Sequence, residues 1–109
     1  MELINDINRL KEMAYSKPFF LLYIQAPDCG LCSVMLNKVE QVTHNHEMLR
    51  SAHVELLVVP EIAGTFLVAT APTVLVFVRG KEVFRSGTFI DTLKLEQVLT
   101  MWEDNLNCF

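Results

Sequence analysis

Amphipathic stretches with helical spacing alternate with short, continuous apolar runs along this chain. Residues 2–15 carry apolar side chains at intervals of three or four positions, which predicts an amphipathic helix. The same spacing recurs over 30–46 and over 92–106 and predicts two further helices. A short helix is expected from 61 to 67, directly after a proline that suits a first helical turn.

Four segments have the composition and length of strands. Residues 19–25 are apolar at nearly every position, which is typical of a strand that is buried on both faces of a sheet. Residues 53–59 form a second such run, and residues 73–78 a third. A tight turn over 79–81 leads into a fourth strand at 82–86, so the last two strands are expected to pair as an antiparallel hairpin.

The order of elements is therefore α-β-α-β-α-β-β-α in a chain of 109 residues. We expect a single domain over 1–109, because two domains of half this length would each bury too small a core. This α/β order predicts a central mixed four-stranded sheet with helices on both faces. Strands that are joined by helices are expected to be parallel, and the last pair antiparallel.

Composition and charge narrow the functional classes. The chain is 51% hydrophobic and has a formal net charge of −4, so it lacks the basic surface that nucleic acids or anionic membranes attract. Its longest apolar runs are far shorter than the ~20 residues that span a bilayer. The start of the sequence also lacks the pattern of a signal peptide. We therefore expect a cytoplasmic protein that binds neither nucleic acid nor membranes.

The spacing and context of two cysteines indicate redox chemistry. Cys29 and Cys32 are three positions apart, after an expected strand and at the start of an expected helix. A helix N-terminus stabilises a thiolate and lowers its pKa, which activates the sulfur as a nucleophile. Cys29 is therefore the expected exposed nucleophile, and Cys32, one turn further, the buried thiol that resolves a mixed disulfide. Gly30 is expected to let the chain make a tight entry into the helix.

Metal binding is another interpretation of the cysteine pair, because CxxC pairs are common in zinc sites. Such sites usually need a second pair of ligands, and no other cysteine or histidine has the required spacing. The residues considered are Cys108, His44, His46 and His53. No metal is therefore expected, although a metal or iron–sulfur site shared between two chains at a dimer interface stays open.

The chain resembles the thioredoxin family over nearly its whole length. The resemblance rests on the strand–CxxC–helix unit at 19–46, on the segment Ala71–Pro72–Thr73 that opens the third strand, and on the hairpin followed by a final helix. It implies a thioredoxin fold with a cis peptide bond before Pro72, which faces the cysteine pair. It also implies that Ala71 and Pro72 bind substrate, with Ala71 offering backbone groups to a peptide. Gly87 matches a family glycine near the same groove.

The resemblance implies a thiol-disulfide oxidoreductase that reduces disulfide-bearing proteins through Cys29 and Cys32. No bound cofactor is expected, since electrons would come from a reductase or a low-molecular-weight thiol. Three residues depart from the family pattern: Asp28 replaces the usual tryptophan before the first cysteine, Leu31 replaces the usual proline between the cysteines, and Tyr23 replaces a buried acid. Asp28 and Tyr23 favour an alternative function, a thioredoxin-fold protein-binding module with redox-idle cysteines.

The remaining candidate residues are assigned structural roles. Cys108 is expected to be a free thiol near a mobile chain end, and the three histidines to be solvated or satisfied polar residues. Trp102 is expected to pack against the sheet. Three methionines at helical positions are expected to fill the core: Met35, Met48 and Met101.

Overall fold

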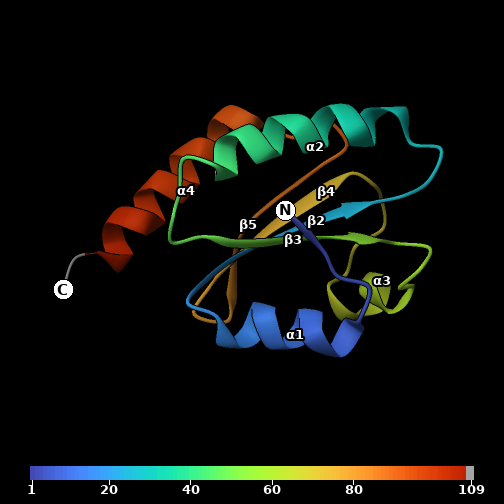
Figure 1. Ribbon diagram of the computed structural model, residues 1–109, viewed down its shortest axis with the longest axis horizontal. Coiled ribbons are helices and arrows are strands. Elements are labelled where there is room, and N and C mark those ends of the chain that lie inside the picture. Colours follow the sequence, from blue (N-terminus) through green and yellow to red (C-terminus); the bar gives the residue numbers. More distant parts are fainter. Residues whose placement is uncertain (108–109) are drawn as a thin grey trace.

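Figure 1 shows the computed structural model of the chain, which describes residues 1–107. Along these residues the elements are β1 (Glu2–Leu3), α1 (Ile7–Ser16), β2 (Phe19–Gln25), α2 (Gly30–Thr43), β3 (Arg50–Glu55), α3 (Glu61–Thr65), β4 (Thr73–Val78), β5 (Lys81–Gly87) and α4 (Thr92–Leu106). The expected α/β class is confirmed, and β2, β4 and α4 have the bounds that the sequence predicts.

The sheet separates two layers of helices. Its five strands lie in the order β1-β3-β2-β4-β5, with α1 and α3 on one face and α2 and α4 on the other (Figure 1). β2 lies in the middle, and residues 19–24 are at most 1% exposed, which confirms a strand buried on both faces. Alternate side chains of β2 therefore enter two separate hydrophobic cores, one beneath each helical layer.

The strand β1 corrects two expectations, a four-stranded sheet and a helix over 2–15. β1 pairs in parallel with β3 at the edge of the sheet, and the N–H of Ile4 donates to the carbonyl oxygen of His53. Two residues are too few to show a strand period, so apolar spacing alone assigns them to the helix. α1 begins at Ile7 instead, because the Asp6 side chain accepts hydrogen bonds from two backbone N–H groups of the first turn.

β3 lies three to four residues earlier in the chain than the predicted strand at 53–59. Within β3, Ala52 and Val54 are buried and alternate with half-buried or exposed polar residues, so only one face has the pattern of a buried strand. The apolar run that suggested a strand continues beyond β3 into a turn. There Leu57 and Val58 are exposed to solvent rather than packed in the core.

Helix length decides the direction of each following strand. α2 has 14 residues and is about 21 Å long, so it returns the chain along the length of β2, and β3 is parallel to β2 as predicted. α3 has only 5 residues, about 7.5 Å, and is too short for such a return. β4 therefore begins at the end of the sheet where β3 ends and runs antiparallel to β2. β3 and β4, which α3 joins, therefore run in opposite directions. The expectation that strands joined by a helix are parallel is wrong for this pair.

β4 and β5 form the predicted antiparallel hairpin. Its two turn residues, Arg79 and Gly80, both have left-handed backbones with φ of 50° and 85°, which is the geometry of a type I′ turn. A Cβ atom on Gly80 would lie 2.8 Å from the carbonyl oxygen of Tyr15, so the close approach also requires glycine. Arg85 of β5 donates to two carbonyl oxygens of the segment that follows α3.

Trp102 on α4 packs against the core beneath α2 and α4, as expected. Its indole also lines a groove of about 300 Å³, together with Val78 at the end of β4 and Lys81 in the hairpin. The groove therefore lies at the end of the sheet where β4 terminates.

The expectation that three methionines fill the core is confirmed only for Met35. Met48 is exposed, because α2 ends at Thr43 and Met48 lies in the turn that follows. Met101 is exposed on the outer face of α4, together with Leu93 eight positions earlier. A single apolar residue on an outer helical face cannot be separated from the buried stripe by spacing alone.

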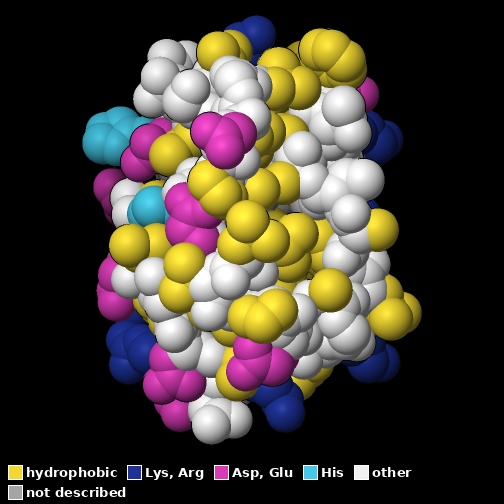
Figure 2. Space-filling model, turned by 90° about the vertical axis from the view of Figure 1, so that its right-hand side faces the viewer, with side chains coloured by type: hydrophobic (Ala, Val, Ile, Leu, Met, Phe, Trp, Pro, Cys, Tyr) yellow, Lys and Arg dark blue, Asp and Glu magenta, His cyan; other side chains and the backbone are white. Residues whose placement is uncertain are grey.

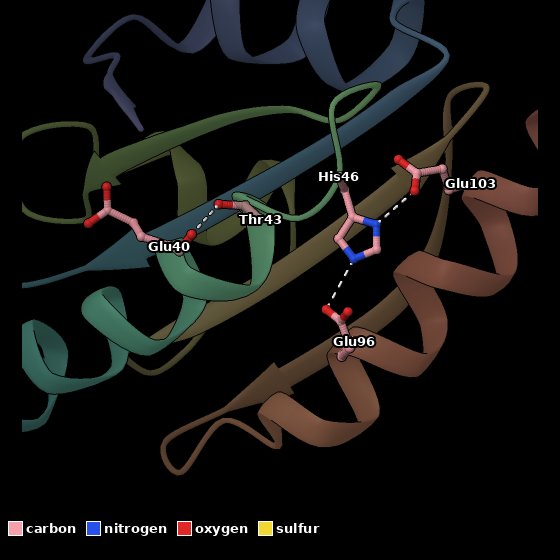
Figure 3. Close-up of polar contacts among 5 residues, drawn as sticks. All are labelled: Glu40, Thr43, His46, Glu96 and Glu103. Carbon is pink, nitrogen blue, oxygen red and sulfur yellow. Dashed lines mark hydrogen bonds and ion pairs between the residues drawn. The ribbon is translucent and has the colours of Figure 1, made fainter.

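His46 links the end of α2 to α4 (Figure 3). Its side chain is 3% exposed and lies between two carboxylates of α4. Nε2 lies 3.0 Å from Glu96 Oε2, and Nδ1 lies 3.1 Å from Glu103 Oε1. Burial alone would lower the pKa of His46, but the hydrogen bonds to both carboxylates outweigh it and raise the pKa above its usual value. Because carboxylates only accept, both ring nitrogens donate when the imidazole is charged.

Candidate active site

The two cysteines of the CxxC motif form a disulfide at the start of α2. The Cα atoms of Cys29 and Cys32 are 5.3 Å apart, and the N–H of Cys32 donates to the carbonyl oxygen of Cys29 in the first helical turn. Cys29 is the N-cap residue of α2 and is partly exposed, whereas Cys32 is 4% exposed. The expected difference in exposure between the two sulfur-bearing residues is therefore confirmed.

Four segments meet at the end of the sheet that carries this disulfide. β2 and β3 are parallel, so both end here, and the N–H of Leu56 donates to the carbonyl oxygen of Gln25. β4 begins here, since Thr73 pairs with Ile24, and β5 ends here, since Gly87 pairs with Thr73. We call this end the disulfide end and define it by residues 25–33, 55–61, 67–73 and 87–93.

The structure brings Ala71 and Pro72 to the disulfide, as expected. The Ala71–Pro72 peptide bond is cis, and the Sγ of Cys29 lies 3.9 Å from the carbonyl oxygen of Ala71. On the other side of this loop, the N–H of Thr88 donates to the carbonyl oxygen of Pro72. Thr88 has a left-handed backbone with φ of 64°, whereas Gly87 before it does not. A Cβ atom on Gly87 would lie 3.2 Å from Thr73 Oγ1, so its small size serves the close packing of this loop.

The tight entry into α2 is made by Asp28 rather than by Gly30, which corrects an expectation. Asp28 has a left-handed backbone with φ of 57°, a region that aspartate tolerates better than most residues. A Cβ atom on Gly30 would meet no atom within 4 Å, and its φ is not left-handed. The Asp28 carboxylate is exposed next to Cys29.

Tyr23 lies fully buried beneath the start of α2. Its hydroxyl donates a 2.6 Å hydrogen bond to the carbonyl oxygen of Cys32. Burial raises the pKa of Tyr23 to about 12, so the phenol stays protonated and keeps this donor. The tyrosine is therefore a polar brace between β2 and the second cysteine, a contact that sequence reasoning did not anticipate.

The histidines do not extend the site. His44 is exposed, and His46 is satisfied by two carboxylates, as expected. The expectation is wrong for His53, whose Nδ1 is buried and lacks a hydrogen-bond partner within the described chain; burial is the main cause of its lowered pKa. No group of three or more potential metal ligands occurs among residues 1–107. Cys108 lies outside the described residues.

Exposed apolar side chains surround the disulfide, a feature that sequence reasoning missed. Among residues 1–107, the most exposed large hydrophobic residues are between 61% and 77% exposed, and all lie in the disulfide end: Leu57, Val58, Leu67, Phe89 and Leu93. Figure 2 looks onto this end and shows hydrophobic side chains gathered across its middle. The signal in the sequence was an apolar run that continues beyond Glu55, the last residue of β3.

Two curated relatives match most of the chain. The thioredoxin-like protein YdfQ of Bacillus subtilis (strain 168) is 33% identical over 81 residues, which cover 74% of this chain and 72% of the relative. A thioredoxin of Griffithsia pacifica is 28% identical over 79 residues, which cover 72% of each chain. No protein-family model matches the chain.

Solved structures share the architecture. The thioredoxin Mala s 13 of Malassezia sympodialis is similar over 94% of this chain and 90% of its own, with a TM-score of 0.82 and 17% sequence identity. This likeness confirms the expected fold, although the sheet has one strand more than predicted.

Proposed function

The chain belongs to the thioredoxin family and is a thiol-disulfide oxidoreductase, and from that premise we propose that Cys29 and Cys32 carry its reaction and that it reduces protein disulfides. One observation carries the proposal most directly. The Cys29–Cys32 disulfide lies at the N-terminus of α2, with Cys29 Sγ 3.9 Å from the carbonyl oxygen of Ala71 beside the cis Pro72.

In the first step, the Cys29 thiolate attacks one sulfur of the substrate disulfide. A bond forms between Cys29 and that sulfur, and the other substrate sulfur leaves as a thiolate that takes up a proton. The backbone of Ala71 and the ring of Pro72 hold the substrate segment beside the new mixed disulfide.

In the second step, Cys32 gives up its proton and attacks Cys29 Sγ. The Cys29–Cys32 disulfide forms and the second substrate sulfur leaves as a thiolate, so two electrons have passed from the dithiol to the substrate. The partial exposure of Cys29 and the burial of Cys32 support this order of attack. A reductase or a low-molecular-weight thiol then restores the dithiol.

The reducing direction agrees with a cytoplasmic location, which we also propose. Disulfides are rare in that compartment, and those that occur there are usually transient and catalytic or redox-sensing. Within residues 1–107, no helix has the length and apolar character needed to cross a membrane. Fractionation of cells that express the tagged protein tests the location.

Insulin reduction with dithiothreitol as electron source tests the function. We expect the wild-type chain to accelerate reduction, Cys29→Ser to abolish the acceleration, and Cys32→Ser to accumulate a mixed disulfide through Cys29. Equal activity of Cys29→Ser and wild type would refute the assignment. The reduction potential of the pair gives the direction: a value near roughly −270 mV supports a reductant, and one near roughly −120 mV an oxidant.

A further inference from the structure

The four segments of the disulfide end contain acidic residues and no lysine or arginine. Two basic residues border it: Lys94 follows the last segment, and Arg85, which pairs with Glu82, donates to the carbonyl oxygen of Leu67. All nine lysine and arginine residues of the chain lie outside its four segments, whereas four acidic residues lie within them: Asp28, Glu55, Glu61 and Asp91. Figure 2 shows the consequence: acidic side chains lie among the hydrophobic ones, and lysine and arginine lie toward the margins of the face. The surface that meets a substrate is therefore apolar with negative charge.

Asp28 is the acidic residue best placed to meet a substrate. It directly precedes Cys29, and its carboxylate is exposed. Two of the other acids are engaged within the protein, because Glu55 accepts from Gln25 Nε2 at 2.7 Å and Asp91 caps α4. No residue in the described part of the chain hydrogen-bonds or ion-pairs with Asp28. Its charge is thus available to a partner.

Apolar side chains flank Asp28 and Cys29 on two sides. Leu57 and Val58 follow β3, which ends beside β2 and the loop that carries Asp28. Phe89 follows Thr88, whose N–H bonds to the carbonyl oxygen of Pro72. A substrate segment that brings its disulfide to Cys29 would pass between these apolar side chains and next to Asp28.

We propose that this site prefers protein disulfides in apolar segments that carry a lysine or arginine next to the attacked cysteine. The preference arises in the first step described above, when a substrate cation beside the disulfide pairs with the Asp28 carboxylate. The inference rests on the proposed function, because it concerns the choice of substrate for the same thiol attack.

An exposed ion pair has a modest effect, so we expect a modest preference. A pair worth about 0.2–1 kcal/mol corresponds to roughly a 1.4- to fivefold change in rate constant. Replacing Asp28 with lysine reverses the sign of the interaction and should invert the preference. Salt should weaken it, because exposed charges are screened.

Three peptides with the same apolar sequence and one disulfide, which differ only in a Lys, Gln or Glu next to the attacked cysteine, test the proposal. The second-order rate constant for reduction by the reduced protein is measured at low and high salt, for wild type, Asp28→Asn and Asp28→Lys. Asp104→Asn is the matched control, since Asp104 is exposed on the last turns of α4 and its loss changes the net charge equally. The readout is the rate constant for the Lys peptide divided by the rate constant for the Glu peptide. Any change in Cys29 reactivity affects both rate constants equally and cancels in this ratio.

We expect wild type and Asp104→Asn to prefer the Lys peptide, Asp28→Asn to lose most of the preference, and Asp28→Lys to invert it. Equal rates for all three peptides with wild type, or a ratio unchanged in both Asp28 variants, would overturn the inference and leave the proposed function intact. Failure of the wild-type protein to reduce any of the peptides would instead count against the proposed function.

Discussion

The buried contact between His46 and two glutamates of α4 yields a pH-dependent contribution to stability. A hydrogen bond to a charged group contributes about 1.5–3 kcal/mol, and this range suits Glu103, whose side chain is 21% exposed. Glu96 is 38% exposed, so its bond is closer to the ~0.2–1 kcal/mol of an exposed pair. After the cost of burying the imidazolium, we expect His46→Gln to lower the free energy of unfolding by about 2 kcal/mol at pH 5.5.

The sign of the pH dependence follows from the raised pKa of His46. A group whose pKa is higher in the folded than in the unfolded chain stabilises the folded state. For a histidine, this stabilisation is complete below the unfolded pKa of about 6.5. This contribution is lost as the pH rises through the folded pKa, because the neutral ring can donate from only one nitrogen. The difference between wild type and His46→Gln should therefore be largest near pH 5.5 and smaller at pH 9.

Urea unfolding of the oxidised proteins, followed by circular dichroism at both pH values, measures this difference. Both proteins carry Cys108→Ser, because a free thiol would exchange with the Cys29–Cys32 disulfide at alkaline pH. His44→Gln is the matched control, since His44 is exposed two positions away in the same turn. A stability difference that stays constant or grows between pH 5.5 and pH 9 would refute the argument.

Four further predictions concern the cysteine pair and the tyrosine beneath it. In the reduced Cys108→Ser protein, limiting iodoacetamide should modify Cys29 well before Cys32, as mass spectrometry of peptides would show; faster labelling of Cys32 would reverse the assigned roles. Asp28→Asn should shift the thiolate absorbance of Cys29 modestly to lower pH, because a neighbouring negative charge disfavours the thiolate; no shift would mean that the carboxylate points away. Tyr23→Phe should lower the free energy of unfolding by about 0.5–1.5 kcal/mol, because it removes the hydrogen bond that the phenol donates to the buried carbonyl of Cys32. Tyr23→Asp should speed release of a small thiol from Cys29 in stopped-flow measurements, if proton removal from Cys32 limits that step, and an unchanged rate would exclude this limit.

The elements that the sequence predicts well are those whose pattern is local. The continuous apolar run of β2, the run of β4 and the spacing of α4 each specify an element without reference to the rest of the chain. β1 could not be predicted in this way, because its two residues are ordered by pairing with β3 residues that lie 50 positions later in the sequence. The direction of β4 likewise depends on the true length of α3, which the apolar pattern overestimates.

The candidate site likewise combines features that local sequence patterns predict with features that depend on tertiary structure. The spacing of Cys29 and Cys32, and the proline of the loop before β4, are local signals that place the reactive pair. The surface around them follows from tertiary structure, and the misplaced strand at 53–59 shows why. Leu57 and Val58 have the composition of a core strand, but they lie where β3 has already ended, so a rule that buries apolar runs assigns them to the interior.

The position of Trp102 decides what its intrinsic fluorescence can report about this protein. It is the only tryptophan of the chain, and it lines the same groove as Val78, at the far end of β4 from the disulfide. The five residue steps of β4 span about 17 Å, too far for contact quenching of the indole by the disulfide. Its emission should thus follow unfolding of the α4 layer equally in the oxidised and reduced protein, so reactions of the thiols are followed by thiolate absorbance or by an extrinsic chromophore rather than by the indole.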